Sequence, residues 1–122
     1  MASSTMPKPL DGIVDTKMTY KKPSTFTNCT YDTGGYCVIN KNLVLVNIRV
    51  TSTTSTDLTI SGLPNYSLIS NSNNVSVNVM RMDTNTHPGT FAYLARNGIL
   101  TASGGIVNNG VYVFSCIYLS DG

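Results

Sequence analysis

Residues 43–52, with the sequence LVLVNIRVTS, are the stretch that decides the fold. Every second side chain from Val44 to Val50 is branched and apolar. The alternate positions are more mixed: Leu43, Leu45, Asn47 and Arg49. A period of two with one fully apolar face predicts a half-buried β-strand, because successive side chains of a strand point to opposite sides.

Other segments repeat this alternation on both sides of that stretch. They are GYCVI (35–39), DLTISGLP (57–64), VSVNVM (75–80), TFAYLA (90–95), ILTASG (99–104) and VYVFSCIYLS (111–120). Asn97-Gly98 lies between two of them and predicts a tight type I′ hairpin turn. The spacing of strands and turns predicts an antiparallel, jelly-roll-like β-sandwich of seven to eight strands without substantial helix.

Composition supports the same fold class. The chain of 122 residues contains 13 Ser, 16 Thr and 13 Asn but no Glu, Gln or Trp. Short uncharged polar side chains hydrogen-bond to nearby backbone and favour strands, turns and caps over helix interiors. A predominantly helical protein is therefore excluded.

The chain divides into two parts. Residues 1–33 contain Pro7, Pro9, Pro23 and four lysines with few apolar residues, which predicts an extended arm or linker. One short strand is expected within this arm, near residues 12–20. Residues 34–122 are expected to form the β-sandwich, a single domain.

Neither the charge nor the apolar runs of the chain favour binding to nucleic acid or insertion into a membrane. The net charge is +2 and charged residues make up only 11% of the chain. The basic residues are scattered, whereas nucleic-acid binding requires them to be concentrated. No apolar run approaches the roughly 20 residues of a membrane helix, and the N-terminus lacks the apolar region of a secretory signal.

The cysteines leave two interpretations open. Cys29 and Cys37 flank YDTGGY, a loop that a disulfide could close, or Cys29, Cys37 and Cys116 are all reduced thiols. Their number and spacing do not fit a metal site, so neither a metal nor a cofactor is expected.

The sequence offers few residues from which a catalytic site could be built. His87 is the only histidine and lies among turn-forming residues, and the six aspartates mostly lie in predicted turns. Gly34-Gly35 and Gly104-Gly105 are read as turns that connect strands. A non-enzymatic protein is therefore predicted.

A saccharide site is the best-supported kind of binding site. It would use aromatic rings against apolar sugar faces, and amides or guanidinium groups against hydroxyls. Three groups qualify: Asn65 with Tyr66; Tyr93 with Arg96 and Asn97; and Arg81 near Asp83 and His87.

Two segments favour self-association. The final strand, 111–120, is apolar on both faces, and residues 43–50 carry leucines on their second face. Subunits packed around a symmetry axis would cover this surface. Alternatively, both strands lie in the centre of the sandwich. Arg49 is expected at a surface or interface beside a carboxylate, because an unpaired buried charge is costly.

The order of these signals from residue 35 onward is similar to the C-terminal head or knob domains of phage tail-fibre and baseplate receptor-binding proteins. The matching stretches are GYCVINKNLVLVNIRV, LTISGLPNYS, AYLARNGILTASG and NNGVYVFSCIYLSDG. The resemblance implies a homotrimeric knob in the virion that presents loops to a host surface saccharide, and it implies no catalytic residues. The chain departs from the family in having NYSL where many knobs have GYRP, and it shows no stalk repeat.

Two alternatives accompany this hypothesis. The protein could be a structural decoration or head-fibre protein that docks to the virion through residues 1–33. It could also be a bacterial C1q- or tumour-necrosis-factor-like trimer domain of a surface protein.

Overall fold

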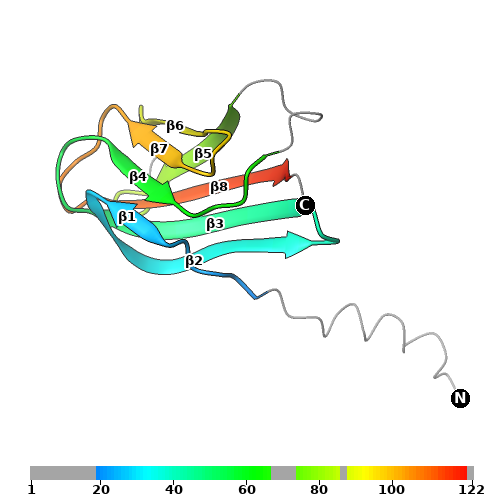
Figure 1. Cartoon of the computed structure of the whole chain (residues 1–122). Helices are drawn as coiled ribbons and strands as arrows, with labels where there is room; N and C mark the ends of the chain where they lie inside the picture. The colour runs from blue at the N-terminus through cyan, green and yellow to red at the C-terminus, as the bar shows by residue number, and fades with distance from the viewer. Residues whose placement is uncertain (1–18, 67–73, 86–87, 121–122) are drawn as a thin grey trace, which may run out of the picture.

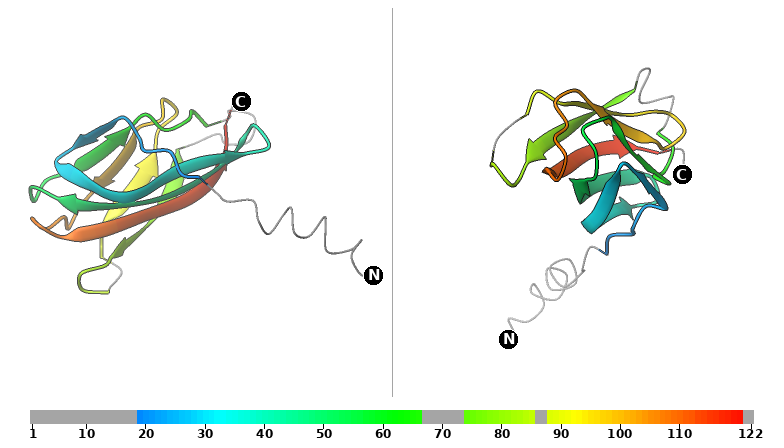
Figure 2. Two further views of the ribbon diagram at one scale, coloured as in Figure 1. Left: turned by 90° about the horizontal axis from the view of Figure 1, so that it is seen from below. Right: turned by 90° about the vertical axis from the view of Figure 1, so that its left-hand side faces the viewer.

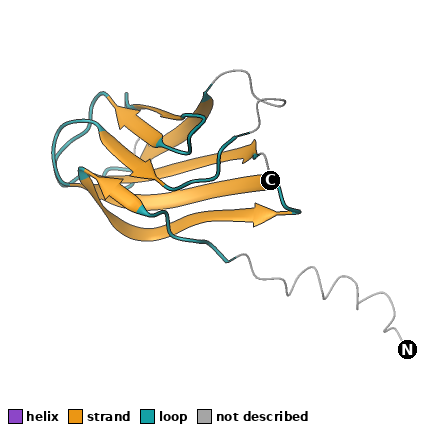
Figure 3. Ribbon diagram, in the orientation of Figure 1, coloured by secondary structure: helices purple, strands orange, loops and turns teal. Residues whose placement is uncertain are grey.

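The protein is built from eight antiparallel β-strands, seen together in Figure 1. The computed structural model describes residues 19–66, 74–85 and 88–120. The strands are β1 (Thr25–Thr27), β2 (Cys29–Ile39), β3 (Leu43–Ser52), β4 (Leu58–Ser61), β5 (Val75–Arg81), β6 (Phe91–Leu94), β7 (Leu100–Ser103) and β8 (Val111–Leu119). The described residues contain no helix (Figure 3), which confirms the predicted all-β class.

The strands form two packed layers that are joined into a nearly closed sheet, as the end view in Figure 2 shows. Their order is β1-β4-β7-β6-β5-β8-β3-β2. β5 passes from one layer to the other, since it pairs with β6 through Val75–Val77 and with β8 through Asn78–Arg81. We call the layer of β2, β3, β8 and the second half of β5 the β8 sheet. The other layer, which contains β1, β4, β7 and β6, is the β7 sheet.

The pairing is nested in the manner of a jelly roll. β3 pairs with β8, β4 with β7, and β5 with β6. A long hairpin whose two arms are β3-β4-β5 and β6-β7-β8 produces this pattern when it is rolled up. The sequence prediction of a jelly-roll-like sandwich therefore agrees with the observed pairing.

The core lies between the two sheets. The apolar positions of β3, from Val44 to Val50, are almost completely buried, as are Leu58 and Ile60 of β4. Tyr112 and Phe114 of β8 are the largest fully buried side chains among the described residues. Burial of each such side chain contributes about 1.5–3 kcal/mol of hydrophobic free energy. The inward-facing positions predicted from period two are thus the core.

The predicted arm is shorter than expected. Residues 25–33 lie in the sheet, because Phe26 pairs with Ile60 and packs on the core, and the first part of β2 pairs with β3. These edge strands are mostly polar, so their pattern lacked apolar periodicity. The short strand expected near residues 12–20 falls mainly outside the described residues, and Thr19 and Tyr20 are not in a strand.

The turn predicted at Gly34 and Gly35 is wrong, because both residues lie inside β2. A Cβ atom on Gly35 would lie 2.0 Å from the carbonyl oxygen of Lys21, and one on Gly34 would lie 2.1 Å from that of Asn47. The two glycines therefore let β2 be approached closely by the chain on both of its edges. By contrast, Gly104 and Gly105 do lie in the loop between β7 and β8.

The cysteines do not form a disulfide. Cys29 and Cys37 belong to the same strand, β2, where eight residues of extended chain span on the order of 25 Å. A disulfide requires Cα atoms less than about 7 Å apart. All three cysteines are free thiols, so the proposed closed loop is excluded within the chain.

The outer surfaces of the two sheets differ in chemistry. On the β8 sheet, Leu43 lies opposite Leu119 and Leu45 lies opposite Ile117, and opposed residues share a face. We call these four residues the leucine face; Ile117 is 66% exposed. The outward positions of the β7 sheet are rich in hydroxyls, with pairs such as Thr59↔Thr101 and Thr25↔Ser61.

β8 is central, as predicted, but only its inner face is covered within one chain. Arg49 lies on the outer side of the β8 sheet, where its Nε atom is 3.8 Å from Oδ2 of Asp32. Both side chains are partly exposed. The expectation of a surface position beside a carboxylate is therefore confirmed for Arg49.

Candidate binding site

A shallow hollow, which we call the asparagine hollow, lies at one end of the sandwich, where the β6–β7 turn meets the segment after β4. It has a volume of about 650 Å³ and is lined by Asn65, Asn74, Ala95, Arg96 and Asn97. These residues come from three separated parts of the sequence. Only the tertiary fold brings them together.

The β6–β7 turn is fixed by backbone hydrogen bonds. The Ala95 amide donates to Ile99 O (2.9 Å), and the Gly98 amide donates to Ala95 O (3.0 Å). Gly98 has a φ of 81°, whereas Arg96 and Asn97 have negative φ. The predicted type I′ turn is therefore wrong, since it requires positive φ at both central residues. A three-residue loop ending in a left-handed glycine takes its place.

Gly98 also docks this turn against the chain that follows β4. The amide of Leu63 donates to Gly98 O at 3.2 Å. A Cβ atom on Gly98 would lie 2.0 Å from the carbonyl oxygen of Leu63. Glycine is thus required twice, for its positive φ and for this close approach, and it holds Asn97 near Asn65.

Tyr66 supports the hollow from beneath and does not line it. Its side chain is only 4% exposed, and the guanidinium carbon of Arg96 lies 5.8 Å from its ring centroid. The same segment is held to β8 because the Tyr118 hydroxyl donates to Pro64 O at 2.8 Å. The predicted stacking of a ligand on Tyr66 is therefore replaced by a cation–π contact that orients Arg96.

The chemistry of the hollow is that of neutral amides beside one guanidinium. The amides of Asn65, Asn74 and Asn97 each offer donors and an acceptor, and a guanidinium offers only donors. No carboxylate is among the described lining residues. Such a set suits a ligand with several hydroxyl or carbonyl oxygens.

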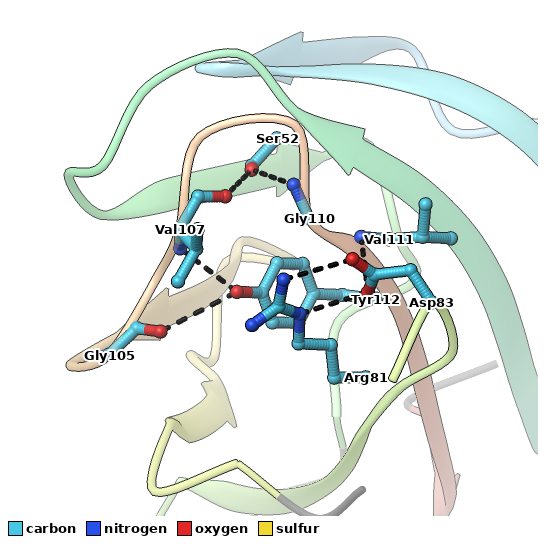
Figure 4. A network of polar contacts seen from close by, with 8 residues as sticks. All are labelled: Ser52, Arg81, Asp83, Gly105, Val107, Gly110, Val111 and Tyr112. Carbon is cyan, nitrogen blue, oxygen red and sulfur yellow. Dashed lines mark hydrogen bonds and ion pairs between the residues drawn. The ribbon is translucent and has the colours of Figure 1, made fainter. Parts of the chain in front are cut away.

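Arg81 lies at the opposite end of the sandwich, in the network of Figure 4. Its Nε and Nη2 atoms donate to the two carboxylate oxygens of Asp83, each at 2.9 Å. Asp83 Oδ1 also accepts from the Val111 amide at 3.2 Å. These hydrogen bonds, that of Arg81 above all, lower the pKa of Asp83 to about 2. The predicted ligand group Arg81–Asp83 is thus an ion pair that fastens the end of β5 to β8.

Ser52 and Tyr112 fasten the neighbouring loop, 104–110, in the same network (Figure 4). The Ser52 hydroxyl donates to Val107 O and accepts from the Gly110 amide at 3.2 Å. The Tyr112 hydroxyl accepts from the Val107 amide at 2.9 Å. The polar groups at this end satisfy one another and leave little for a ligand.

The remaining predicted residues lie elsewhere. Tyr93 is on the outer face of the β7 sheet, opposite Ser76 and Thr101 and 39% exposed. His87 lies outside the described residues. The hollow therefore unites Asn65, Arg96 and Asn97 with Tyr66 beneath them, and it excludes Arg81 and Tyr93.

Sequence reasoning missed Asn74 and Ala95 as lining residues. Asn74 ends a cluster of turn-forming residues just before β5, and Ala95 begins the β6–β7 turn. A register for the β5–β6 pair would have placed Asn74 beside that turn, because Val75 lies opposite Leu94.

Two of the three thiols are weak nucleophiles. Burial raises the pKa of the Cys29 and Cys116 thiols to about 11, so both are protonated at neutral pH and weak as nucleophiles. Within the described ranges, no three His, Cys, Asp or Glu residues gather as metal ligands. The same ranges contain no helix that could span a membrane.

The comparisons with known proteins identify no relative. No protein-family model, curated protein or solved structure matches the chain.

Proposed function

We propose that the protein is a non-enzymatic knob of a phage fibre or baseplate, which self-associates as a homotrimer and binds a saccharide on the host surface. The observation that carries the binding role is the hollow. Three asparagine amides and a guanidinium converge there from segments far apart in the sequence.

A saccharide is the ligand class that suits this set of groups. Sugar hydroxyls both donate and accept, and asparagine amides do the same. The Arg96 guanidinium adds donors for ring, carbonyl or acidic oxygens. The turn that carries Arg96 and Asn97 is held by its own hydrogen bonds and by Leu63, so binding costs little ordering of the backbone.

Self-association is supported by the leucine face. Ile117 is 66% exposed and Leu119 36% exposed, on the central strand of the β8 sheet. Beside them, Tyr20, Leu45 and Ile117 border an apolar hollow of about 470 Å³. Contiguous exposed apolar side chains mark interaction surfaces, and a closed oligomer would bury them.

The binding role is tested on an array of neutral and acidic glycans that includes host cell-wall fragments. Asn97→Ala and Arg96→Ala should each weaken binding roughly tenfold or more, since each removes hydrogen bonds to the ligand. Asn108→Ala, an exposed asparagine in the β7–β8 loop, is the matched control and should bind normally. A protein that binds no glycan but attaches to virions would support the decoration-protein alternative instead.

The oligomer is tested by sedimentation velocity at micromolar concentration. Ile117→Lys should dissociate the trimer into monomers, because an unpaired charge would have to be desolvated at the interface. Val107→Lys changes an apolar loop residue of 42% exposure and should leave the trimer intact. A wild-type protein that sediments as a monomer would contradict the proposal.

A further inference from the structure

A second groove crosses the outer surface at the point where β5 changes sheets. It has a volume of about 500 Å³ and involves β5, β6, β8 and the segment before β6. Its lining residues are Ser76, Val77, Asn78, Val79, Pro88, Thr90, Phe91, Ala92, Ser115, Cys116 and Ile117. This groove is separate from the asparagine hollow, with which it shares no lining residue.

The splitting of the two sheets produces this groove. The ladder of β5 with β6 ends at Val77↔Ala92, and its ladder with β8 begins at Asn78↔Ser115. β6 and β8 therefore diverge on the two sides of β5. The outward side chains of β5, Ser76 and Asn78, form the floor between them.

The β6 wall carries an unusually exposed aromatic side chain, since Phe91 is 72% exposed. Ile117 of the β8 wall belongs to the leucine face that the proposed trimer would bury, so the site is assigned to the β5–β6 side of the groove. Tyr93 follows Phe91 on the same outward face, about 7 Å further along the strand. An aromatic side chain left exposed on a regular strand beside a polar floor is a surface that a ligand can stack on.

The polar groups of the groove are all neutral. Ser76 and Ser115 supply hydroxyls, and Asn78 supplies an amide. The Thr90 hydroxyl oxygen is buried and is not presented to the groove.

We propose that this groove is a second saccharide site, one that takes a neutral sugar chain with a ring stacked on Phe91. The inference rests on the proposed function, because it assigns a second glycan-binding surface to the same knob. Sugar rings combine an apolar face with hydroxyl edges, which matches an aromatic wall above a floor of hydroxyls and an amide. None of the described residues that line the groove is charged, so an acidic glycan would gain no ion pair there.

A peptide strand fits the groove less well. Strand addition needs a long free edge of a sheet. The unpaired edges here are short, because β5 is paired with β6 up to Val77 and with β8 from Asn78. Recognition by side chains, as for a saccharide, therefore suits this groove better.

The test titrates maltotetraose, cellotetraose and chitotetraose into the full-length protein, with side-chain amide NMR signals and calorimetry as readouts. The side-chain amide NMR signals of Asn78 should shift when the tetrasaccharide is added. Phe91→Ala and Asn78→Ala should weaken binding roughly tenfold or more, and Phe91→Tyr should retain it. Both residues are exposed, so the thermal stability of the variant proteins should stay close to that of the wild type.

Asn108→Ala and Val107→Ala, both at exposed loop residues, are the matched variants for this experiment. Neither should change the binding of a neutral tetrasaccharide to the groove. If glycan binding is lost only in Arg96→Ala and Asn97→Ala, the groove proposal fails while the proposed function stands. If binding is lost in Phe91→Ala and Asn78→Ala but kept in Arg96→Ala and Asn97→Ala, the groove stands and the hollow is not a site. If no array glycan and no tetrasaccharide binds, both fail.

Discussion

The two ends of β8 carry similar residues, but they differ in whether the polar groups around them are already paired within the fold. At one end Tyr112 receives a hydrogen bond from the Val107 amide, and Ser52, Arg81 and Asp83 complete a network in which the polar groups satisfy one another. At the other end Tyr118 secures the segment after β4, but the amides beside it face an open hollow. We call these the Ser52 end and the Asn97 end.

This difference teaches where function can lie in a protein so rich in short polar side chains. A hydroxyl or amide that is already paired within the fold adds stability and has little to offer a ligand. At the Asn97 end the backbone turn is secured by glycine geometry and by backbone hydrogen bonds instead. The amides of Asn65 and Asn97 there are left to face solvent or a ligand.

The largest effect on stability is expected from Gly98→Ala. The new Cβ would lie 2.0 Å from Leu63 O at a φ of 81°, so the turn must move away from the Leu63 segment. We expect a loss of about 3 kcal/mol in the free energy of unfolding, measured by urea denaturation, together with a loss of glycan binding. At Gly89, no atom of the described residues, apart from the chain neighbours, lies within 4 Å of an added Cβ, so Gly89→Ala should change little. Equal stability of the two variants would show that Gly98 does not secure the Asn97 end.

A smaller effect is expected from Ser52→Ala at the Ser52 end. The change removes the hydroxyl that donates to Val107 O and accepts from the Gly110 amide, at a residue that is fully buried. The Gly110 amide still donates to Val107 O at 2.9 Å, so the unfolding free energy should fall by only about 1 kcal/mol while glycan binding is kept. Ser55→Ala, in the exposed loop after β3, is the control and should leave both quantities unchanged. A loss of binding in Ser52→Ala would mean that the two ends are coupled.

The smallest effect is a pH dependence from Asp83. Its pKa is lowered from 3.8 to about 2 in the folded protein, so the ionised pair with Arg81 favours folding above about pH 4. That contribution should disappear as the pH falls from 4 towards 2. Thermal unfolding of wild type and Asp83→Asn should therefore differ by a few degrees at pH 6 and converge near pH 2. An unchanged difference at pH 2 would assign the stabilisation to something other than the carboxylate charge.

The strands with strong alternation could be predicted from the sequence. In β3, β4 and β5 the apolar side of the alternation is the buried side, because a strand on a core must place apolar residues at every second position. β8 is apolar on both faces, so its central position but not its buried face could be predicted. The first strands could not be predicted in this way. β1 and the start of β2 are edge strands with mostly polar faces, so little apolar signal marks them.

The candidate site could be predicted only in pieces. The residues Asn65, Arg96 and Asn97 were recognisable as polar groups suited to a saccharide, but so was Arg81, which turned out to be paired with Asp83. Tyr66 has the right chemistry for stacking on a sugar, yet it is buried. Sequence gives residue type, whereas availability to a ligand depends on which polar groups already have partners.

The sequence by itself therefore determined an all-β fold, the inward face of its main strands and the absence of helix from the part that the structure describes. These features follow from local periodicity and from the conformational preferences of Ser, Thr and Asn. Only the tertiary structure decided that β5 changes sheets and opens a groove, and that the glycine at 98 brings separate segments into one hollow. These depend on contacts between residues far apart in the chain, which local patterns do not encode.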